Sequence, residues 1–236
     1  MTSKLIRAVV MIGALLGPAL AANAADLRAR PLPYKPAPVV PLYGWSGFYF
    51  GINGGWGWGD SHWDAPPAFG MRGSGALAGL TYGYNFQSGA MVFGIEGDID
   101  WSDISGSTAC GAGTCSFRNR WLGTLRGRIG PGFDRVLPYV TGGLAYGGVR
   151  ASNSLFTTAD TTAIGWTAGA GVEFALANAW TAKIEYLYVD LGRFDCGVAC
   201  GLGLPENVGF TANVVRIGLN YRFNGGGLGG PLVTRY

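Results

Sequence analysis

The chain has 236 residues, of which 48% are hydrophobic, only 13% are charged and 42 are glycine. This apolar content excludes a disordered polypeptide. The 17 basic and 14 acidic residues leave a formal net charge of +3, which excludes the strongly basic surface of a nucleic-acid-binding protein.

The first 24 residues have the three-part layout of a secretory signal peptide. Lys4 and Arg7 precede an apolar run over residues 8–22, and Ala22-Asn23-Ala24 offers a small-residue cleavage site. A membrane anchor is the alternative, but the run is shorter than the ~20 residues that cross a bilayer as a helix. We therefore expect cleavage, with a mature chain that begins at Ala25.

Residues 25–44 form a proline-rich segment that we interpret as a periplasmic linker. Five prolines lie between positions 31 and 41, and proline removes a backbone donor and favours extended backbone. Docking to a partner through the Pro-x-Pro spacing is the alternative, but so unspecific a motif favours a spacer.

Beyond residue 25, glycines and polar residues interrupt every apolar run before it reaches the ~18 residues of a transmembrane helix. Instead, apolar residues recur at every second position, as in strands with one apolar face. Phe48, Phe50 and Ile52, for example, alternate with Tyr49 and Gly51. Eight such segments lie at about residues 45–59, 76–86, 91–101, 121–130, 139–146, 166–174, 180–188 and 215–223.

Segments of this length suit tilted strands, which cross the hydrocarbon layer in ~9 to 11 residues. A barrel with an even number of strands has both ends of its chain on the same side of the membrane. Short periplasmic turns are expected near residues 88, 134 and 178, and long outer loops around residues 61, 111, 154 and 201. A soluble lipocalin-like barrel would place its apolar residues inside. The predicted fold is all-β, an eight-stranded antiparallel transmembrane β-barrel over residues 45–223.

The face opposite the apolar one has charges of both signs, five of each. Inside a barrel such charges are tolerated when they are paired and hydrogen-bonded. We predict ion pairs between the third and fourth segments. An eight-stranded barrel holds little more than its own side chains, so we interpret these charges as a structural polar core without a hydrophobic interior, rather than a solute path. The predicted lumen residues are Glu96, Asp98, Asp100, Arg126, Arg128, Glu173, Lys183, Glu185, Arg216 and Arg222.

Four cysteines fall in predicted outer loops as two close pairs, Cys110 with Cys115 and Cys196 with Cys200. In an oxidising compartment we expect local disulfides within each pair, the simplest of the three possible connectivities. A zinc site of four thiolates is the alternative, which export disfavours.

His62, the one histidine of the sequence, lies in the first predicted outer loop beside Ser61. This adjacency is weak evidence for catalysis, which needs a base, an orienting acid and an oxyanion site in register. We predict no enzymatic activity, catalytic residue, metal site or cofactor, and no convergence of a carboxylate and a serine on His62.

Residues 45–51, Trp-Ser-Gly-Phe-Tyr-Phe-Gly, follow a start of Ala25-Asp26-Leu27 and resemble the small outer-membrane β-barrel family of α-proteobacteria. Further matching runs lie at residues 93–98, 126–130, 137–143, 183–186 and 215–223. The family is similar to opacity proteins and the OmpA-like membrane domain. Such barrels commonly end on an aromatic residue, whereas here Phe223 is followed by a glycine-rich tail, residues 224–236.

The resemblance implies an abundant surface protein that supports envelope integrity, in a family whose members are labelled porins. From the small size of the barrel we expect at most weak passive permeability. A small-solute porin and a haemin-binding receptor are the alternatives, and His62 is the weak candidate for a haemin ligand. The expected partners are outer-membrane lipid, lipopolysaccharide and the machinery of export and barrel insertion, with no nucleic acid. The outer loops are the expected place of recognition.

Overall fold

The computed structural model describes residues 43–63, 69–110, 113–154, 158–177, 179–195 and 207–223. The predicted signal peptide, most of the predicted linker and the predicted tail lie outside these residues. Within the described ranges, no helix has the length and apolar character needed to cross a bilayer.

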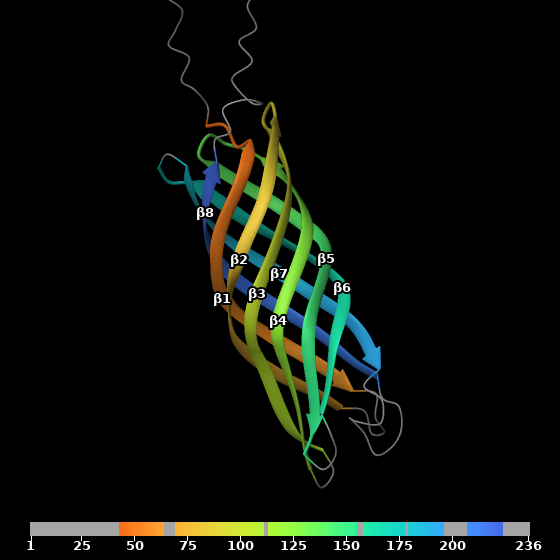
Figure 1. Cartoon of the computed structure of the whole chain (residues 1–236). Helices are drawn as coiled ribbons and strands as arrows, with labels where there is room; N and C mark the ends of the chain where they lie inside the picture. The colour runs from red at the N-terminus through yellow and green to blue at the C-terminus, as the bar shows by residue number, and fades with distance from the viewer. Residues whose placement is uncertain are drawn as a thin grey trace, which may run out of the picture. The chain divides into compact units, whose positions relative to one another are not determined.

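The described residues form eight antiparallel strands that close into a barrel in chain order (Figure 1). The first strand pairs with both the second and the last, so neither of its edges is left open. This confirms the predicted fold class. The strands are β1 (Gly47–Trp63), β2 (Phe69–Ser88), β3 (Met91–Cys110), β4 (Gly113–Pro131), β5 (Val136–Asn153), β6 (Thr158–Ala175), β7 (Trp180–Asp195) and β8 (Asn207–Phe223).

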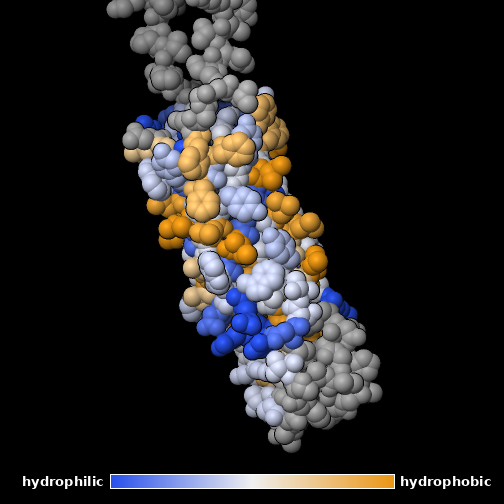
Figure 2. Space-filling view, in the orientation of Figure 1, coloured by the Kyte–Doolittle hydropathy of each residue, from blue (hydrophilic) through white to orange (hydrophobic). Residues whose placement is uncertain are grey.

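The two faces of the wall follow the alternation of the sequence. Phe48 is 65% exposed, whereas its neighbour Tyr49 is 3% exposed inside the barrel. The outward aromatic and aliphatic side chains cover much of one half of the surface, and a strongly hydrophilic patch lies below them (Figure 2). An apolar exterior around a polar interior is the arrangement of a transmembrane barrel.

Short turns connect the strands at one end of the barrel, which we call the short-turn end. β1 begins and β8 ends at this same end. Residues 89–90 join β2 to β3, and residues 132–135 join β4 to β5. Gly89 and Asp134 adopt positive φ angles of 59° and 47°, as tight turns require. Short turns are periplasmic in such barrels, so the opposite end, which we call the loop end, faces outward.

The strands have 16 to 20 residues, which is longer than the alternation of apolar residues predicts. They extend at the loop end, so His62, Cys110 and Cys115 lie in β1, β3 and β4 rather than in the predicted loops. Most outward positions of these extensions are polar or glycine, which ended the apolar signal, although Ile164 in β6 is an exposed apolar exception. Backbone pairing continues regardless, as in the opposition of His62 and Gly70.

Trp45 was predicted to begin the first strand, but it precedes β1 and closes the mouth of the barrel at the short-turn end. Its side chain is 1% exposed. Its backbone N–H donates to Gln87 Oε1 at 2.7 Å, and its indole Nε1 donates to the Asp134 carbonyl oxygen at 3.0 Å. Gly47, at a φ of 132°, provides the change of direction between Trp45 and β1.

We predict that Trp45→Ala lowers the free energy of unfolding by about 3–5 kcal/mol, because the truncation leaves a cavity and removes the indole donor. Urea unfolding of the purified full chain in detergent measures this loss. Trp180→Ala is the control, since Trp180 is 44% exposed on the outward face and detergent can replace its neighbours. Equal losses in the two variants would contradict the role of Trp45 as a plug.

Candidate functional site

The lumen is the first candidate site, because it contains all the charges that the sequence analysis placed there. The structure places each of the ten predicted lumen residues inside the barrel, with at most 4% of its surface exposed. They come from β3, β4, β6, β7 and β8. Nine of them make ion pairs with one another in the middle of the lumen, and Arg222 lies apart.

Arg126 on β4 connects both sides of this ion-pair network. Its Nη2 donates to Glu96 Oε1 at 2.6 Å and to Asp98 Oδ2 at 2.8 Å, both on the neighbouring strand β3. Its Nη1 donates to Glu185 Oε1 on β7 at 2.9 Å. The last contact spans the lumen, because β4 and β7 are not adjacent in the barrel.

Arg216 on β8 makes the second crossing. Its Nη1 donates to Asp100 Oδ2 at 3.0 Å and its Nη2 to Asp98 Oδ2 at 2.8 Å, so it reaches β3. Its Nε donates to Glu185 Oε2 at 2.8 Å. The predicted ion pairs between β3 and β4 therefore form part of a larger network that joins opposite walls.

Glu96 is the most heavily bonded carboxylate of the network. It accepts hydrogen bonds from Tyr49, Arg126, Arg128 and Lys183, at 2.6 to 3.1 Å. The three cations on a single carboxylate offset the cost of burying it.

Arg128 extends the network toward the short-turn end. Its Nη2 donates to Glu173 Oε2 at 2.5 Å. Its guanidinium carbon lies 4.6 Å from the centre of the Tyr139 ring and 5.3 Å from that of Tyr49, where the negative faces of the rings attract the cation.

Arg222 has a different position from the other nine charges. Its guanidinium donates to the Gly44 carbonyl oxygen, and its central carbon lies 4.4 Å from the centre of the Tyr43 ring. Burial raises the pKa of Tyr43 above its usual value. Arg222 thus fastens the segment before β1 to the barrel mouth.

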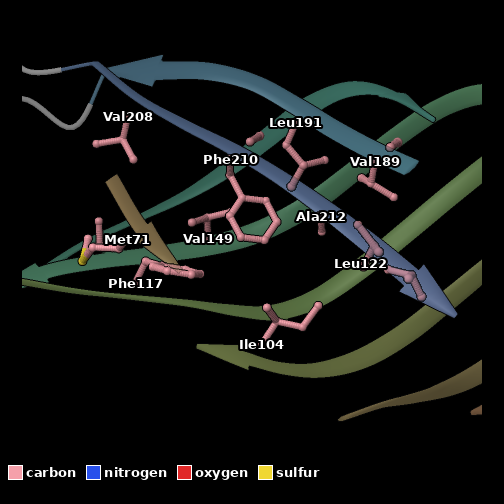
Figure 3. Close-up of a cluster of buried hydrophobic side chains, with 14 of the residues drawn as sticks. Met71, Ile104, Phe117, Leu122, Val149, Val189, Leu191, Val208, Phe210 and Ala212 are labelled. Atoms are coloured by element: carbon pink, nitrogen blue, oxygen red, sulfur yellow. The ribbon is translucent and has the colours of Figure 1, made fainter. Parts of the chain in front are cut away.

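Two apolar layers enclose the ion-pair network, and the expectation of a lumen without a hydrophobic interior is wrong. The layer at the short-turn end consists of Trp45, Val92, Leu137, Tyr139 and Ala175. The layer toward the loop end is larger, and Figure 3 shows its side chains pointing toward one another from several strands. Its members include Met71, Ile104, Phe117, Leu122, Val149, Leu187, Val189, Leu191, Val208, Phe210 and Val214.

Phe117 and Phe210 form the centre of this larger layer, with ring centroids 5.6 Å apart in an edge-to-face arrangement. Both residues are 1% exposed. Neither residue belongs to a predicted strand, because both lie in stretches that the apolar alternation alone assigns to outer loops. The alternation of Val208, Phe210 and Ala212 is the signal from which this layer was predictable.

Of the predicted disulfide cysteines, only the side chain of Cys115 belongs to the described part of the chain. It is buried, at 2% exposure, and takes part in a disulfide bond. In the ladder between β3 and β4, Cys110 lies opposite Gly113 and Cys115 opposite Thr108. The pairings Cys110–Cys115 and Cys196–Cys200 stay predictions, since the other three side chains lie outside the described residues.

His62 and Ser61 point to opposite faces of β1. Ser61 is 2% exposed inside the barrel, whereas His62 is exposed on the outward face, so the two do not form a catalytic pair. His62 borders a cavity of about 690 Å³, which is lined by the outward residues Asp60, Arg72, Asp190 and Arg193 and also by Ser61, Met71 and Phe210, whose side chains are buried. Among the described residues, no group of three or more His, Cys, Asp or Glu side chains is arranged to hold a metal ion.

Comparison with known proteins gives one family and several relatives. The model of the outer membrane protein beta-barrel domain matches residues 12–223. The 31 kDa outer-membrane immunogenic protein of Brucella melitensis is 37% identical over 229 residues, which cover 87% of this chain and 95% of that protein. The 22 kDa outer membrane protein of Rhizobium leguminosarum is 34% identical over 189 residues, which cover 79% of this chain and 82% of that protein. The crystal structure of Neisserial surface protein A is similar at a TM-score of 0.43 and 16% identity, covering 77% of this chain and all of that one.

We predict that Arg126→Met lowers the free energy of unfolding by about 3–5 kcal/mol, because it removes a buried cation that Glu96, Asp98 and Glu185 share and leaves the network with an excess of negative charge. Urea unfolding in detergent measures the loss. Adding Glu185→Gln is expected to recover part of it, since this removes one negative charge from a network that has lost a cation.

Arg150→Met is the control for this experiment, because Arg150 pairs with Asp160 at 2.7 Å on the exposed surface. Its loss is expected to be much smaller, since exposed ion pairs contribute little. Similar losses for Arg126→Met and Arg150→Met would show that the network does not stabilise the barrel.

Proposed function

This chain belongs to the outer membrane protein beta-barrel domain family and is an outer-membrane protein, and from that premise we propose that it is a structural, surface-exposed barrel with a closed lumen. In this role it supports the integrity of the envelope by sealing the membrane around it, and it has at most weak passive permeability. The names of the Brucella relatives, which call them immunogenic, support exposure at the cell surface.

The observation that supports a closed lumen is that side chains of the chain itself occupy it at three levels. Trp45 and its neighbours lie at the short-turn end, the ion-pair network lies in the middle, and the layer around Phe117 and Phe210 lies toward the loop end. An eight-stranded barrel encloses little more space than such side chains need. A solute would have to part both apolar layers and break contacts such as Arg126 to Glu185.

Two features support a non-enzymatic role. The five network carboxylates each form an ion pair with arginine or lysine in the lumen, so within the described residues none of them is left without a cation. His62 and Ser61 face opposite sides of the wall. We therefore propose that lipid around the apolar exterior, rather than a substrate, is the principal partner of the barrel.

A small-solute porin is the alternative, and conductance separates it from a closed barrel. We predict that the full chain in a planar bilayer gives no large, stepwise, ion-selective channels. Phe117→Ala with Phe210→Ala opens the layer toward the loop end and is expected to raise only the basal leak, because the ion-pair network remains. Large regular steps from the unaltered chain would establish a porin.

A haemin-binding receptor is the second alternative, and its one histidine candidate is exposed beside charged residues. We predict that His62→Ala leaves the affinity for haemin, measured by absorbance titration of the full chain, unchanged within about twofold. An affinity at least about tenfold weaker, or about 1.4 kcal/mol, would instead make His62 a haemin ligand.

A further inference from the structure

A ring of aromatic residues on the outward face marks where the membrane ends toward the loop end. Trp58, Trp101 and Tyr188 are each followed, two residues further along their strands, by an aspartate: Asp60, Asp103 and Asp190. Tryptophan and tyrosine gather at the interface of transmembrane barrels. The charged residues immediately beyond them therefore lie at the depth of the lipid headgroups, where Figure 2 shows the hydrophilic patch on the face in view.

The cavity of about 690 Å³ beside His62 lies in this belt, on the adjoining strands β7, β8, β1 and β2. The strand register explains why the wall is hollow there. His62 lies opposite Gly70 in β2 and opposite Gly209 in β8, so the neighbours on both sides have no side chain. Gly209 in turn lies opposite Arg193 in β7.

Packing does not require either glycine. A Cβ at Gly70 would have its nearest neighbour, the Ser61 carbonyl oxygen, at 3.8 Å, and a Cβ at Gly209 would have Arg193 Cγ at 3.7 Å. Both distances are ordinary van der Waals contacts. The two glycines thus keep a hollow open where a side chain would fit, which is unlike the glycines inside the barrel.

Two arginines stand at the border of the hollow, Arg72 from β2 and Arg193 from β7. Arg72 Nε lies 3.4 Å from Asp60 Oδ1, in a pair exposed to solvent, which is too weak to hold the guanidinium against a stronger anion. Arginine binds phosphate through two parallel N–H groups. The volume lies within the ~300–1,000 Å³ of sites for ligands of drug size, so it accommodates a phosphate joined to a sugar-sized body.

We propose that this hollow binds the phosphorylated sugar headgroup of a lipid in the outer leaflet. Arg72 and Arg193 hold the phosphate, and His62, Asp60 and Asp190 are placed to hydrogen-bond the sugar hydroxyls. The inference rests on the outer-membrane placement of the barrel and not on the closed lumen. Its failure would leave the conductance of the barrel unchanged, so the two proposals fail separately.

The experiment titrates the full chain in detergent with bisphosphorylated lipid A and follows the complex by native mass spectrometry. Arg72→Gln with Arg193→Gln is expected to weaken binding at least about tenfold, or about 1.4 kcal/mol. Gly209→Leu, which fills the hollow without a change of charge, is expected to weaken it to a similar degree. Arg72 and Arg193 are exposed and Gly209 is half-buried, and the heat-dependent shift on gels verifies that both variants fold.

The matched control is Arg118→Gln with Arg150→Gln, which removes the same charge from neighbouring strands β4 and β5, outside the hollow. Its affinity is expected to stay within about twofold of the unaltered chain. Equal weakening in both double variants, or undiminished binding of Gly209→Leu, would overturn the site. Equally tight binding of dephosphorylated lipid A would overturn phosphate recognition, and full competition by millimolar inorganic phosphate would overturn the lipid as its source.

Discussion

The constraint on which this barrel depends is that charges buried in its lumen must find partners across it. A carboxylate or guanidinium without a counter-ion in such an interior costs several kcal/mol. Glu96, Glu185 and Asp98 each contact two or more cations. Because Arg126 and Arg216 reach walls that are not their neighbours, the network fixes the strands across the lumen as well as along the ladder.

The layers on either side of the network follow from the same constraint. Apolar layers around Trp45 and around Phe117 separate the ion pairs from both ends of the barrel, and a dry surrounding strengthens the electrostatic attraction. On the outward face the positions of charged and apolar side chains are reversed. Apolar side chains lie at the level of the ion-pair network, and charged ones lie beyond the outward aromatic residues, toward the loop end. The wall thus divides an interior of paired charges and apolar layers from an exterior whose outer belt is charged, where we propose that lipid headgroups bind.

The alternation of apolar and polar residues predicts the fold and the residues of the ion-pair network. Each strand buries one face, and side chains point to opposite faces at successive positions, so the position of a residue in its segment gives its face. The strand ends were not predictable in this way. Around His62 and Cys115 the outward positions lose their apolar character, yet backbone pairing proceeds without it. Trp45 shows the opposite case. It belongs to the first predicted segment, yet it lies before β1 begins and its side chain is buried inside the barrel.

The sequence by itself determined the number of strands, the face on which the side chains of the eight predicted segments lie and the presence of balanced charges inside. Only the tertiary structure decided which of those charges meet, how far the strands extend and where His62 lies between two glycines. The physical reason is that alternation reports on one strand at a time. Contacts such as Arg216 to Asp100 depend on the stagger of all eight strands around the closed barrel.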